Sequence, residues 1–420
     1  MHPKALLEQA AELMRAVLAF EQPADAVVSA YFRQHRALGA RERHALGETV
    51  YAVLRRRLLW EHLAQGGHGL LPRRLVLLAW QGEAHVRDAA IDAAERRWLD
   101  DAMAVDPTTL APQLQHNLPA WLADALRAQP GAAPFDALAQ ALLGSAPLDL
   151  RVNALKARRE AVQAALAAAG IDAAPTPFSP WGLRIDGRPA VDALPAFRDG
   201  LFEVQDEGSQ LLALLLDAHR GEMVVDFCAG AGGKTLAIGA AMRDTGRLYA
   251  FDTSGHRLHA LKPRLARSGL RNVHPVQIAH ERDERVHRLA GKIDRVLVDA
   301  PCSGLGTLRR NPDLKWRRGP VDIAQFGVQQ RAILAAAAAL VKPGGRLVYA
   351  TCSLLALENE DVARAFEQGH PQFEALPAAA ALAQARIGSA GSLVRGPYLE
   401  LWPHRHATDG FFAALWRRRP

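Results

Sequence analysis

The sequence has few cysteines and no long hydrophobic run. Only Cys228, Cys302 and Cys352 occur among its 420 residues, and no two of them form a C-x-x-C pair. Three thiols cannot all pair as disulfides, which fits a reducing compartment, so we expect free cysteines. The longest uninterrupted apolar run, Ala332 to Val341, has ten residues, about half of the ~20 that a membrane span needs. Because the first residues also lack an apolar stretch of signal-peptide length, we expect a cytoplasmic protein.

Metal-binding motifs are missing as well. The 16 histidines form neither an H-E-x-x-H motif nor a cluster with cysteines. Leu305 stands where a P-C-x-x-C deaminase signature beginning at Pro301 would need its second cysteine. These absences predict that the chain holds no metal ion.

Positive charge is concentrated in the later part of the chain. The first 130 residues are electrically balanced, so the whole formal excess of +7 lies in residues 131–420. Together with a pI near 9.6, this excess fits a polyanionic partner, because lysine and arginine release counterions when they neutralise phosphates. An arginine-rich soluble surface explains the charge equally well.

Three stretches that differ in their pattern of apolar residues predict three domains. Residues 1–128 read as a helical domain, since apolar positions such as Leu6 and Leu13 recur at helical spacing. Residues 135–215 alternate short strands with an alanine-rich helix, which predicts a small α+β subdomain. Residues 216–420 alternate apolar strands with helices, which predicts an α/β domain.

The α/β stretch predicts a doubly wound, mostly parallel sheet with a Rossmann-like arrangement. Near-continuous apolar strands separated by helices are typical of sheets that are buried on both faces. Ligands of such sheets lie at the carboxyl ends of the strands, so we expect the chemistry in the loops that follow them. The predicted strands are Met223 to Cys228, Arg247 to Asp252, Val273 to Ile278, Ile293 to Asp299 and Gly345 to Thr351, with a terminal pair at Tyr398 to Trp402 and Phe411 to Trp416.

A glycine-rich turn follows the first of these strands, in the sequence D-F-C-A-G-A-G-G-K-T that begins at Asp226. A phosphate-binding G-x-x-x-x-G-K-[ST] loop would need glycine at Cys228, and a dinucleotide G-x-G-x-x-G motif would need glycine at Thr235. A turn that binds S-adenosylmethionine remains, with Asp226 on the first strand and Asp252 ending the next, where it can bind ribose hydroxyls. The alternative is a tight turn whose aspartates only cap helices.

Two of the three cysteines follow neighbouring predicted strands. Cys302 lies in the sequence A-P-C-S-G after the fourth strand, and Cys352 lies in T-C-S after the fifth. Both thiols should therefore face the same crevice as the glycine-rich turn. A free cysteine is usually an inert small hydrophobic residue, yet two of three at strand ends favour a chemical role.

Together these segments closely resemble the Nol/Nop/Sun (RsmB-like) family of RNA cytosine-5 methyltransferases. The resemblance covers about residues 146–420 and implies a class I methyltransferase core. The first 125 residues look like the helical, NusB-like RNA-binding domain of bacterial members that act on 16S rRNA. The segments that carry the resemblance are 150–156, 204–210, 226–235, 299–306, 309–316, 350–353, 358–360 and 403–412, together with 40–57 for the helical domain.

The resemblance implies both the reaction and its residues. S-adenosylmethionine would donate a methyl group to C5 of a cytosine in RNA, with small-subunit rRNA as the expected substrate. Cys352 would be the nucleophile that adds to C6, Cys302 would assist release of the product, and Asp299 would bind the N3/N4 edge of the base. The residues expected to contact the cofactor are Cys228, Ala229, Gly230, Ala231, Gly232, Gly233, Lys234, Asp252, His280 and Asp299.

One position departs from the family pattern. The family usually has an aspartate after the third strand, on the adenine side of the cofactor, but this strand is followed by Ala279 and His280. His280 is the nearest candidate for that contact, and Asp283 is the alternative.

A basic run follows the Cys302 loop. Five positive side chains lie within ten residues, next to Trp316, which favours contacts with RNA phosphates and stacking on a base. A solvated surface is the alternative. The five residues are Arg309, Arg310, Lys315, Arg317 and Arg318.

Two other functions stay open. A DNA cytosine-5 methyltransferase would use Cys302 as its nucleophile, although that chemistry has no use for a second thiol at Cys352. A non-catalytic RNA-binding or ribosome-assembly factor would keep the fold, although the intact set of Asp299, Cys302 and Cys352 counts against decay. The target RNA and the oligomeric state are open.

Overall fold

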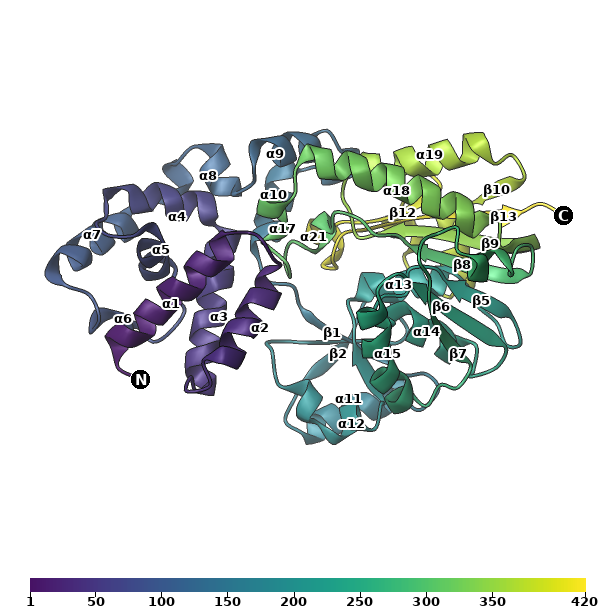
Figure 1. Cartoon of the computed structure of the whole chain (residues 1–420), viewed down its shortest axis with the longest axis horizontal. Coiled ribbons are helices and arrows are strands. Elements are labelled where there is room, and N and C mark those ends of the chain that lie inside the picture. Colours follow the sequence, from purple (N-terminus) through teal and green to yellow (C-terminus); the bar gives the residue numbers. More distant parts are fainter. The chain divides into compact units, whose positions relative to one another are not determined.

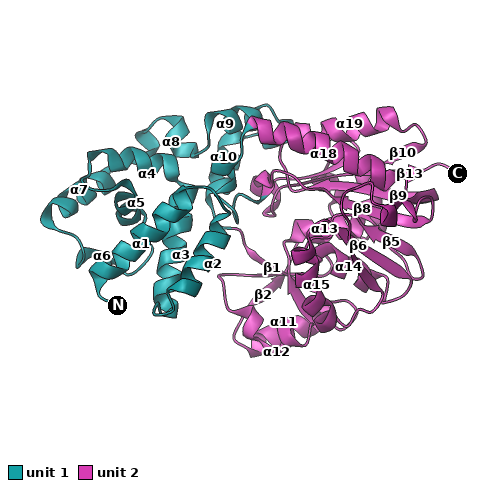
Figure 2. Cartoon of the chain, in the orientation of Figure 1, with its two compact units in different colours: residues 1–145, 307–319 teal, residues 146–306, 320–420 magenta.

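The computed structural model describes residues 1–420 and divides into two compact units (Figure 2). Unit 1 comprises Met1–Ser145 and the distant segment Thr307–Gly319, and unit 2 comprises Ala146–Gly306 and Pro320–Pro420. This division differs from the domains expected from the sequence. The helix at Phe135–Leu143, expected in the second domain, belongs to unit 1, and the small subdomain and the α/β domain share unit 2.

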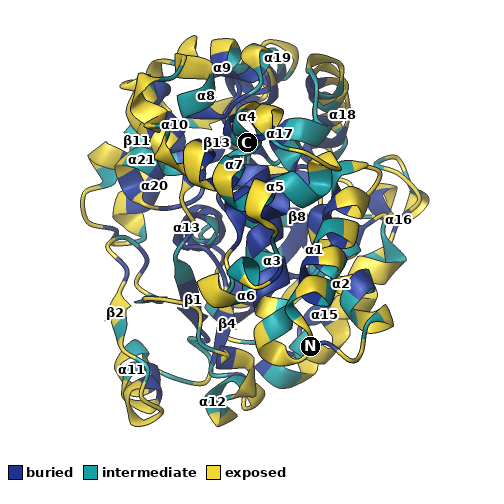
Figure 3. Ribbon diagram, turned by 90° about the vertical axis from the view of Figure 1, so that its left-hand side faces the viewer, coloured by how far each residue is buried: buried dark blue, intermediate teal, exposed yellow.

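Unit 1 is built from helices around one apolar core. The predicted stripe is buried, with Leu6, Leu13 and Val17 at most 6% exposed, and the outer faces of the helices are exposed (Figure 3). No helix of the chain combines the length and the hydrophobicity of a membrane span. The helices are α1 (Pro3–Leu18), α2 (Ala24–Gln34), α3 (Ala40–Arg55), α4 (Arg57–Leu63), α5 (Leu71–Ala79), α6 (Ala84–Asp88), α7 (Ala93–Ala104), α8 (Pro112–His116), α9 (Ala120–Arg127) and α10 (Phe135–Leu143) (Figure 1).

The segment Thr307–Gly319, which contains helix α17 (Leu314–Arg317), completes unit 1. Trp316 packs against the helical core, and its indole Nε1 donates a hydrogen bond to the carbonyl of Leu54 at 2.7 Å. Lys315 Nζ donates to the carbonyl of Arg55 at 2.8 Å. The segment is therefore a structural part of the helical unit.

This packing corrects the prediction of an exposed basic run. Lys315 is 2% exposed and Arg309 is 6% exposed, so neither side chain is available for RNA phosphates as expected. The physical reason is that this segment packs against the helical core, where the carbonyl of Arg55 accepts a hydrogen bond from Lys315. Arg317 pairs with Asp313 at 3.2 Å, and Arg310 and Arg318 are half-buried.

Unit 2 contains a small antiparallel sheet in the strand order β2-β3-β1-β4. Leu150, Leu183 and Phe202 form its core together with Val162 and Leu166 of the helix that covers it. The strands are β1 (Leu148–Val152), β2 (Ala173–Pro175), β3 (Gly182–Ile185) and β4 (Phe202–Val204), and the helices are α11 (Arg159–Ala168) and α12 (Pro195–Arg198). This is the α+β subdomain that the sequence predicts.

The larger sheet of unit 2 has nine strands, in the order β11-β12-β13-β9-β8-β5-β6-β7, with β10 paired to β13. Strands β5 to β9 are parallel to their neighbours within that group, and β10 to β13 pair antiparallel. The strands are β5 (Met223–Asp226), β6 (Arg247–Asp252), β7 (Val273–Gln277), β8 (Ile293–Asp299), β9 (Val341–Thr351), β10 (Phe373–Leu376), β11 (Val394–Arg395), β12 (Tyr398–Leu401) and β13 (Phe411–Arg418).

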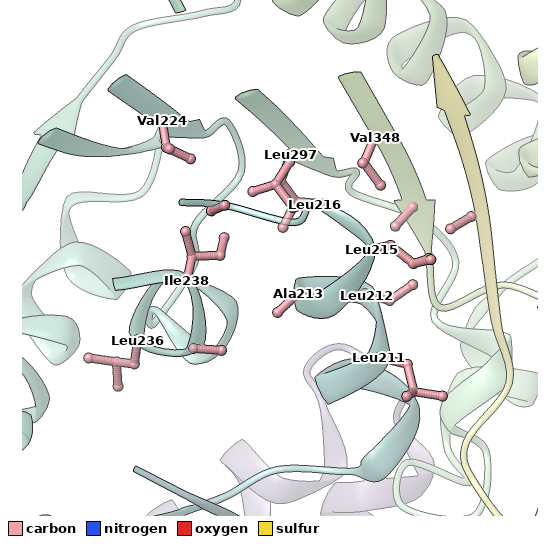
Figure 4. Packing of buried hydrophobic residues seen from close by; sticks show 14 of the residues in the cluster. Leu211, Leu212, Ala213, Leu215, Leu216, Val224, Leu236, Ile238, Leu297 and Val348 are labelled. Carbon is pink, nitrogen blue, oxygen red and sulfur yellow. The ribbon is translucent and has the colours of Figure 1, made fainter. Parts of the chain in front are cut away.

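Helices cover both faces of this sheet. Successive side chains of a strand point to opposite faces, and both faces are apolar, so each face packs against helices in its own apolar cluster. Val224, Leu297 and Val348 meet helices α13 and α14 on one face (Figure 4), whereas Val225, Val296 and Leu347 belong to the cluster on the other face. The helices of unit 2 beyond the small sheet are α13 (Glu207–Leu215), α14 (Gly233–Ala241), α15 (Gly255–Ser268), α16 (Glu284–His287), α18 (Pro320–Ala338), α19 (Glu360–Gly369), α20 (Ala378–Gln384) and α21 (Pro403–His406).

The predicted fold class is confirmed, including the Rossmann-like, mostly parallel sheet, the small α+β subdomain and the all-helical N-terminal part. Strand β5 has β6 on one side and β8 on the other, so the strand order reverses next to β5. This switch point is where doubly wound sheets bind ligands. The loops after β5, β8 and β9 are therefore the place to look for chemistry.

Lys315 predicts a pH dependence of the stability of unit 1. Burial, with the charges of Arg55 and Arg56, lowers the pKa of Lys315 to about 7. In the unfolded chain a lysine titrates near ~10.4, so between these two values the unfolded state binds more protons and stability rises with pH. We expect Lys315→Met to lose this rise, measured as the thermal unfolding midpoint between pH 7 and 9. Substitution of the exposed Lys4 by methionine is the control and should keep the wild-type slope; equal slopes in all three proteins would contradict the assignment.

Candidate active site

The glycine-rich turn connects β5 to α14 and exposes its backbone. Gly230 and Gly232 have φ angles of +56° and +83°, in the left-handed region that favours glycine. A Cβ on Gly232 would lie 2.1 Å from Leu261, whereas open space surrounds the corresponding position on Gly230. Gly232 therefore allows close packing on α15, and Gly230 leaves room for a ligand to approach the chain.

Asp252, at the end of β6, holds this turn in place. Its carboxylate accepts hydrogen bonds from the backbone N–H of Gly230 at 2.8 Å and of Ser254 at 2.7 Å. Each oxygen has a second lone-pair site after these bonds, so ribose hydroxyls could still bind. Nearby, the N–H of Ala229 donates to the carbonyl of Phe251 at 2.8 Å. Asp252 thus caps the turn through both of its oxygen atoms.

Asp226, at the end of β5, is a buried carboxyl group. Its Oδ2 accepts a hydrogen bond from Thr235 at 2.6 Å, and its Oδ1 is buried without a hydrogen-bond partner. Burial raises the pKa of Asp226 to about 7, helped by the nearby charge of Asp299 and opposed by the Thr235 hydrogen bond. A perturbed carboxyl group at a switch point is a common mark of a functional site.

Lys234 and Asp299 form an ion pair between the first turn of α14 and the end of β8. Lys234 Nζ lies 2.6 Å from Asp299 Oδ2 and 5.9 Å from the centre of the Phe411 ring. Burial disfavours the ammonium, but the charge and hydrogen bond of Asp299 outweigh it and raise the pKa of Lys234. The pair places a fixed positive charge and a carboxylate side by side in the crevice.

Cys302 and Cys352 meet at the ends of the adjacent strands β8 and β9. Their Sγ atoms are 3.3 Å apart, and both residues are partly exposed. The hydrogen bond between the thiols, together with burial, raises the pKa of Cys302 well above its ordinary value. The N–H of Gly306 donates to the carbonyl of Cys352 at 2.8 Å, and a Cβ on Gly306 would lie 2.1 Å from the carbonyl oxygen of Gly410. A glycine is therefore needed for this close approach of the two loops.

A carboxylate that the sequence reading did not assign a role, Glu358, ties the two cysteine loops together. It is 0% exposed and accepts from the N–H and hydroxyl of Ser303 at 2.7 and 2.6 Å. The hydroxyl of Ser353 and the amide of Gln330 also donate to it. Because Ser303 follows Cys302 and Ser353 follows Cys352, Glu358 fixes the separation of the thiols. A buried acidic residue five positions after a serine carries no local signal that would reveal this role.

Two arginines that had no predicted role hold the carbonyl groups of the glycine-rich turn. Arg151 of the small sheet donates to the carbonyl of Gly233 at 2.6 Å, and burial lowers its pKa to about 10. Arg264 of α15 donates to the carbonyl of Ala231 at 2.6 Å and pairs with Glu203 at 2.9 Å. The small subdomain therefore supports the turn directly.

The remaining predicted residues have different surroundings. Burial raises the pKa of Cys228 well above its ordinary value, so its thiol is protonated at neutral pH. His280 is exposed in the loop after β7, where its Nδ1 accepts from the N–H of Arg282 at 3.1 Å. Asp283 accepts from the N–H groups of Ala279 and Arg285, each at 2.9 Å, and these bonds lower its pKa. Both candidates for the adenine side thus shape this loop. No group of three or more His, Cys, Asp or Glu side chains is placed to hold a metal ion.

Comparisons with known proteins agree with one another. A family model described as 16S rRNA methyltransferase RsmB/F matches residues 213–417, and one for the ferredoxin-like domain of RsmF/B-like methyltransferases matches residues 118–192. The probable ribosomal RNA small subunit methyltransferase B of a Synechocystis strain is 38% identical over 301 residues, which are 71% of this chain and 66% of that protein. The chain spans less than two thirds of the length of the curated relatives that it matches.

Two solved structures have a fold similar to that of this chain. One crystal structure covers 100% of this chain and 99% of its own, with a TM-score of 0.81 at 28% identity. A methyltransferase homolog protein from Pyrococcus horikoshii covers 75% of this chain and 100% of its own, with a TM-score of 0.63 at 28% identity.

The Glu358 network predicts a large loss of stability on truncation. Glu358→Ala leaves the N–H of Ser303 and two hydroxyls buried without their acceptor, which should lower the unfolding midpoint of unit 2 by roughly 5 °C or more. The two loops should also loosen, so Cys302 and Cys352 should react faster with a thiol-alkylating reagent. The exposed Glu160→Ala variant, also in unit 2, is the control. Unchanged alkylation rates in Glu358→Ala would show that the network does not fix the thiols.

Proposed function

The chain belongs to the RsmB/F family of methyltransferases, and we propose that it transfers a methyl group from S-adenosylmethionine to C5 of a cytosine in RNA. The observation that carries the proposal is the pair of thiols 3.3 Å apart, next to the Lys234–Asp299 ion pair at the switch point of the sheet. The relatives named as small subunit rRNA methyltransferases support small-subunit rRNA as the substrate class.

Features of the crevice support S-adenosylmethionine as the cofactor. The backbone of the turn is open at Gly230, and Asp252 keeps lone pairs for ribose hydroxyls. Asp226 Oδ1, buried without a partner, is the kind of acceptor that the ammonium of an amino acid moiety would satisfy. When bound, the cofactor supplies an electrophilic methyl group on sulfur.

The two thiols suit covalent catalysis on a pyrimidine ring. Cytosine C5 is a poor nucleophile, so the Cys352 sulfur first forms a bond to C6 and turns C5 into an enamine-like carbon. After C5 has taken the methyl group, a base accepts the C5 proton, the electrons of that C–H bond re-form the C5–C6 double bond, and the Cys352 sulfur leaves C6 as a thiolate. Cys302, in contact with Cys352, assists this elimination and thereby frees the product.

Asp299 and Lys234 act together on the base. Lys234 occupies Asp299 Oδ2, which orients the carboxylate so that Oδ1 can accept from the N4 amino group of cytosine. Uracil has a carbonyl at that position and would face the carboxylate unpaired, so this contact selects cytosine. The helical unit 1, with Arg310, Arg317 and Arg318 as the remaining members of the basic run, would contribute to RNA binding.

The roles of the cysteines are tested by transfer of labelled methyl groups to total RNA and, in parallel, to DNA. We expect the wild type to label RNA and Cys352→Ala to lose about 10³-fold or more of this activity, because the nucleophile is missing. Cys302→Ala should accumulate a covalent protein–RNA adduct on a denaturing gel, since release is blocked.

Other results would point elsewhere. Retained labelling of RNA by Cys352→Ala would remove Cys352 as nucleophile. Labelled DNA that depends on Cys302 would favour the DNA methyltransferase. No label in either nucleic acid, including immature ribosomal particles, with RNA still bound by the wild type, would favour an assembly factor.

Cofactor binding is tested at Asp252. We expect Asp252→Ala to weaken the binding of S-adenosylmethionine by roughly 1.5–3 kcal/mol, measured by titration calorimetry, because charge-assisted hydrogen bonds to the ribose are lost. Asp244→Ala is a matched control, since Asp244 also accepts two backbone N–H groups, from Arg271 and Asn272. Equal affinities of both variants would mean that Asp252 is only a cap.

A further inference from the structure

The sulfur atoms of Cys302 and Cys352 lie close enough for a disulfide to form with a small movement. A disulfide joins sulfur atoms at about 2.05 Å, so the two Sγ atoms, now 3.3 Å apart, would have to approach by only about 1.2 Å. Cys302 lies in an irregular loop, Pro301 to Gly304, and Cys352 directly follows β9. Neither side chain lies within a helix that would hold it away from the other.

We propose that Cys302 and Cys352 form a reversible oxidation site, at which a hydroperoxide converts the two thiols into an intramolecular disulfide. The site differs from the use of these residues on cytosine, because it needs neither RNA nor S-adenosylmethionine. Its co-reactant is a peroxide or another two-electron oxidant of similar size.

The chemistry balances in two steps. One thiolate attacks a peroxide oxygen, which gives a sulfenic acid and releases hydroxide. The sulfur of the second thiol then attacks the sulfenic sulfur, so that the S–S bond forms as the S–O bond breaks and water leaves. With hydrogen peroxide as the oxidant, the protein loses two electrons and two protons overall, and the peroxide is reduced to two molecules of water.

Three features of the surroundings favour this outcome over further oxidation of one thiol. Both cysteines are partly exposed, so a small oxidant can reach them. Glu358 holds Ser303 and Ser353, the neighbours of the two cysteines, and so keeps the second sulfur next to a newly formed sulfenic acid. The Lys234 ammonium interacts electrostatically with Cys352, so a positive charge lies beside the pair.

Cys228 gives the contrast within the same chain. No other thiol is in contact with Cys228, whereas the Sγ atoms of Cys302 and Cys352 are 3.3 Å apart, so a sulfenic acid on Cys228 has no partner with which to close a disulfide. The disulfide should therefore form at the pair and not at Cys228. If the proposed function is correct, the disulfide also removes both sulfurs that methyl transfer uses, so oxidation would stop the reaction until a dithiol restores it.

The test is intact-mass spectrometry of the full chain under denaturing, non-reducing conditions after exposure to hydrogen peroxide. We expect the wild type to lose the mass of two hydrogen atoms, to yield a peptide that links Cys302 to Cys352, and to recover its mass with dithiothreitol. Cys228→Ser should behave as the wild type. Cys302→Ser should instead gain oxygen atoms on Cys352.

Three results would overturn the proposal: added oxygen in the wild type without a cross-link, a cross-link that involves Cys228, or complete alkylation of all three thiols after peroxide. The wild-type peptide map decides the matter even if a variant fails to fold. The readout does not depend on methyl transfer. If the cross-link forms but the reduced protein methylates neither RNA nor DNA, the oxidation site is supported and only the proposed function is contradicted.

Discussion

The register between two parallel strands, β8 and β9, sets where the chemistry of this chain lies. Asp299, the last residue of β8, is paired with Ala350 of β9, so the loops that follow both strands start at the same level of the sheet. That register brings Cys302 and Cys352 to one point. The buried Glu358 carboxylate then fixes the point, because its oxygen atoms are shared between the residues that follow the two cysteines. A shift of either strand would separate the thiols.

The electrostatics of the crevice rest on one cation among several carboxyl groups. Asp226, Asp252 and Asp299 end three neighbouring strands, and Lys234 is the basic side chain paired among them. The charges of Asp226 and Asp299 act on each other, which contributes to the raised pKa of Asp226. Binding of a cationic cofactor would relieve this repulsion. Arg151 and Arg264 donate hydrogen bonds to carbonyl groups of the glycine-rich turn and so fix its backbone.

Much of unit 2 could be predicted from the sequence, because its signals are local. Strands such as Ile293–Asp299 are apolar runs with charged ends, and their carboxyl ends identified Asp226, Asp252, Cys302 and Cys352 as neighbours. The missed strands β10 and β11 are short and lie at or near the edge of the sheet, where hydrophobic patterning is weak. Glu358 lies in the segment 358–360 that carries the family resemblance, but its role could not be assigned, since nothing in its local sequence distinguishes a buried carboxylate from a surface one.

In unit 1, by contrast, an important part of the structure could not be predicted from the sequence. Its helices follow from their apolar stripes, but the inclusion of Thr307–Gly319 depends on packing between segments more than 150 residues apart in sequence. A run of four arginines and one lysine after the Cys302 loop resembles an RNA contact, yet Trp316 and Lys315 form hydrogen bonds to carbonyl groups of the helical unit instead. Charge patterning alone cannot separate a solvated face from a buried, hydrogen-bonded segment.

The central claim is that Cys352 forms the covalent bond to a cytosine in RNA. The most direct measurement uses RNA that contains 5-fluorocytidine, whose fluorine cannot leave as the C5 proton does, so the covalent complex is trapped. After digestion, mass spectrometry should find the modified nucleotide on the peptide that contains Cys352, and trapping should require S-adenosylmethionine. A nucleotide attached to Cys302, or no adduct with an RNA that the protein methylates, would contradict the account.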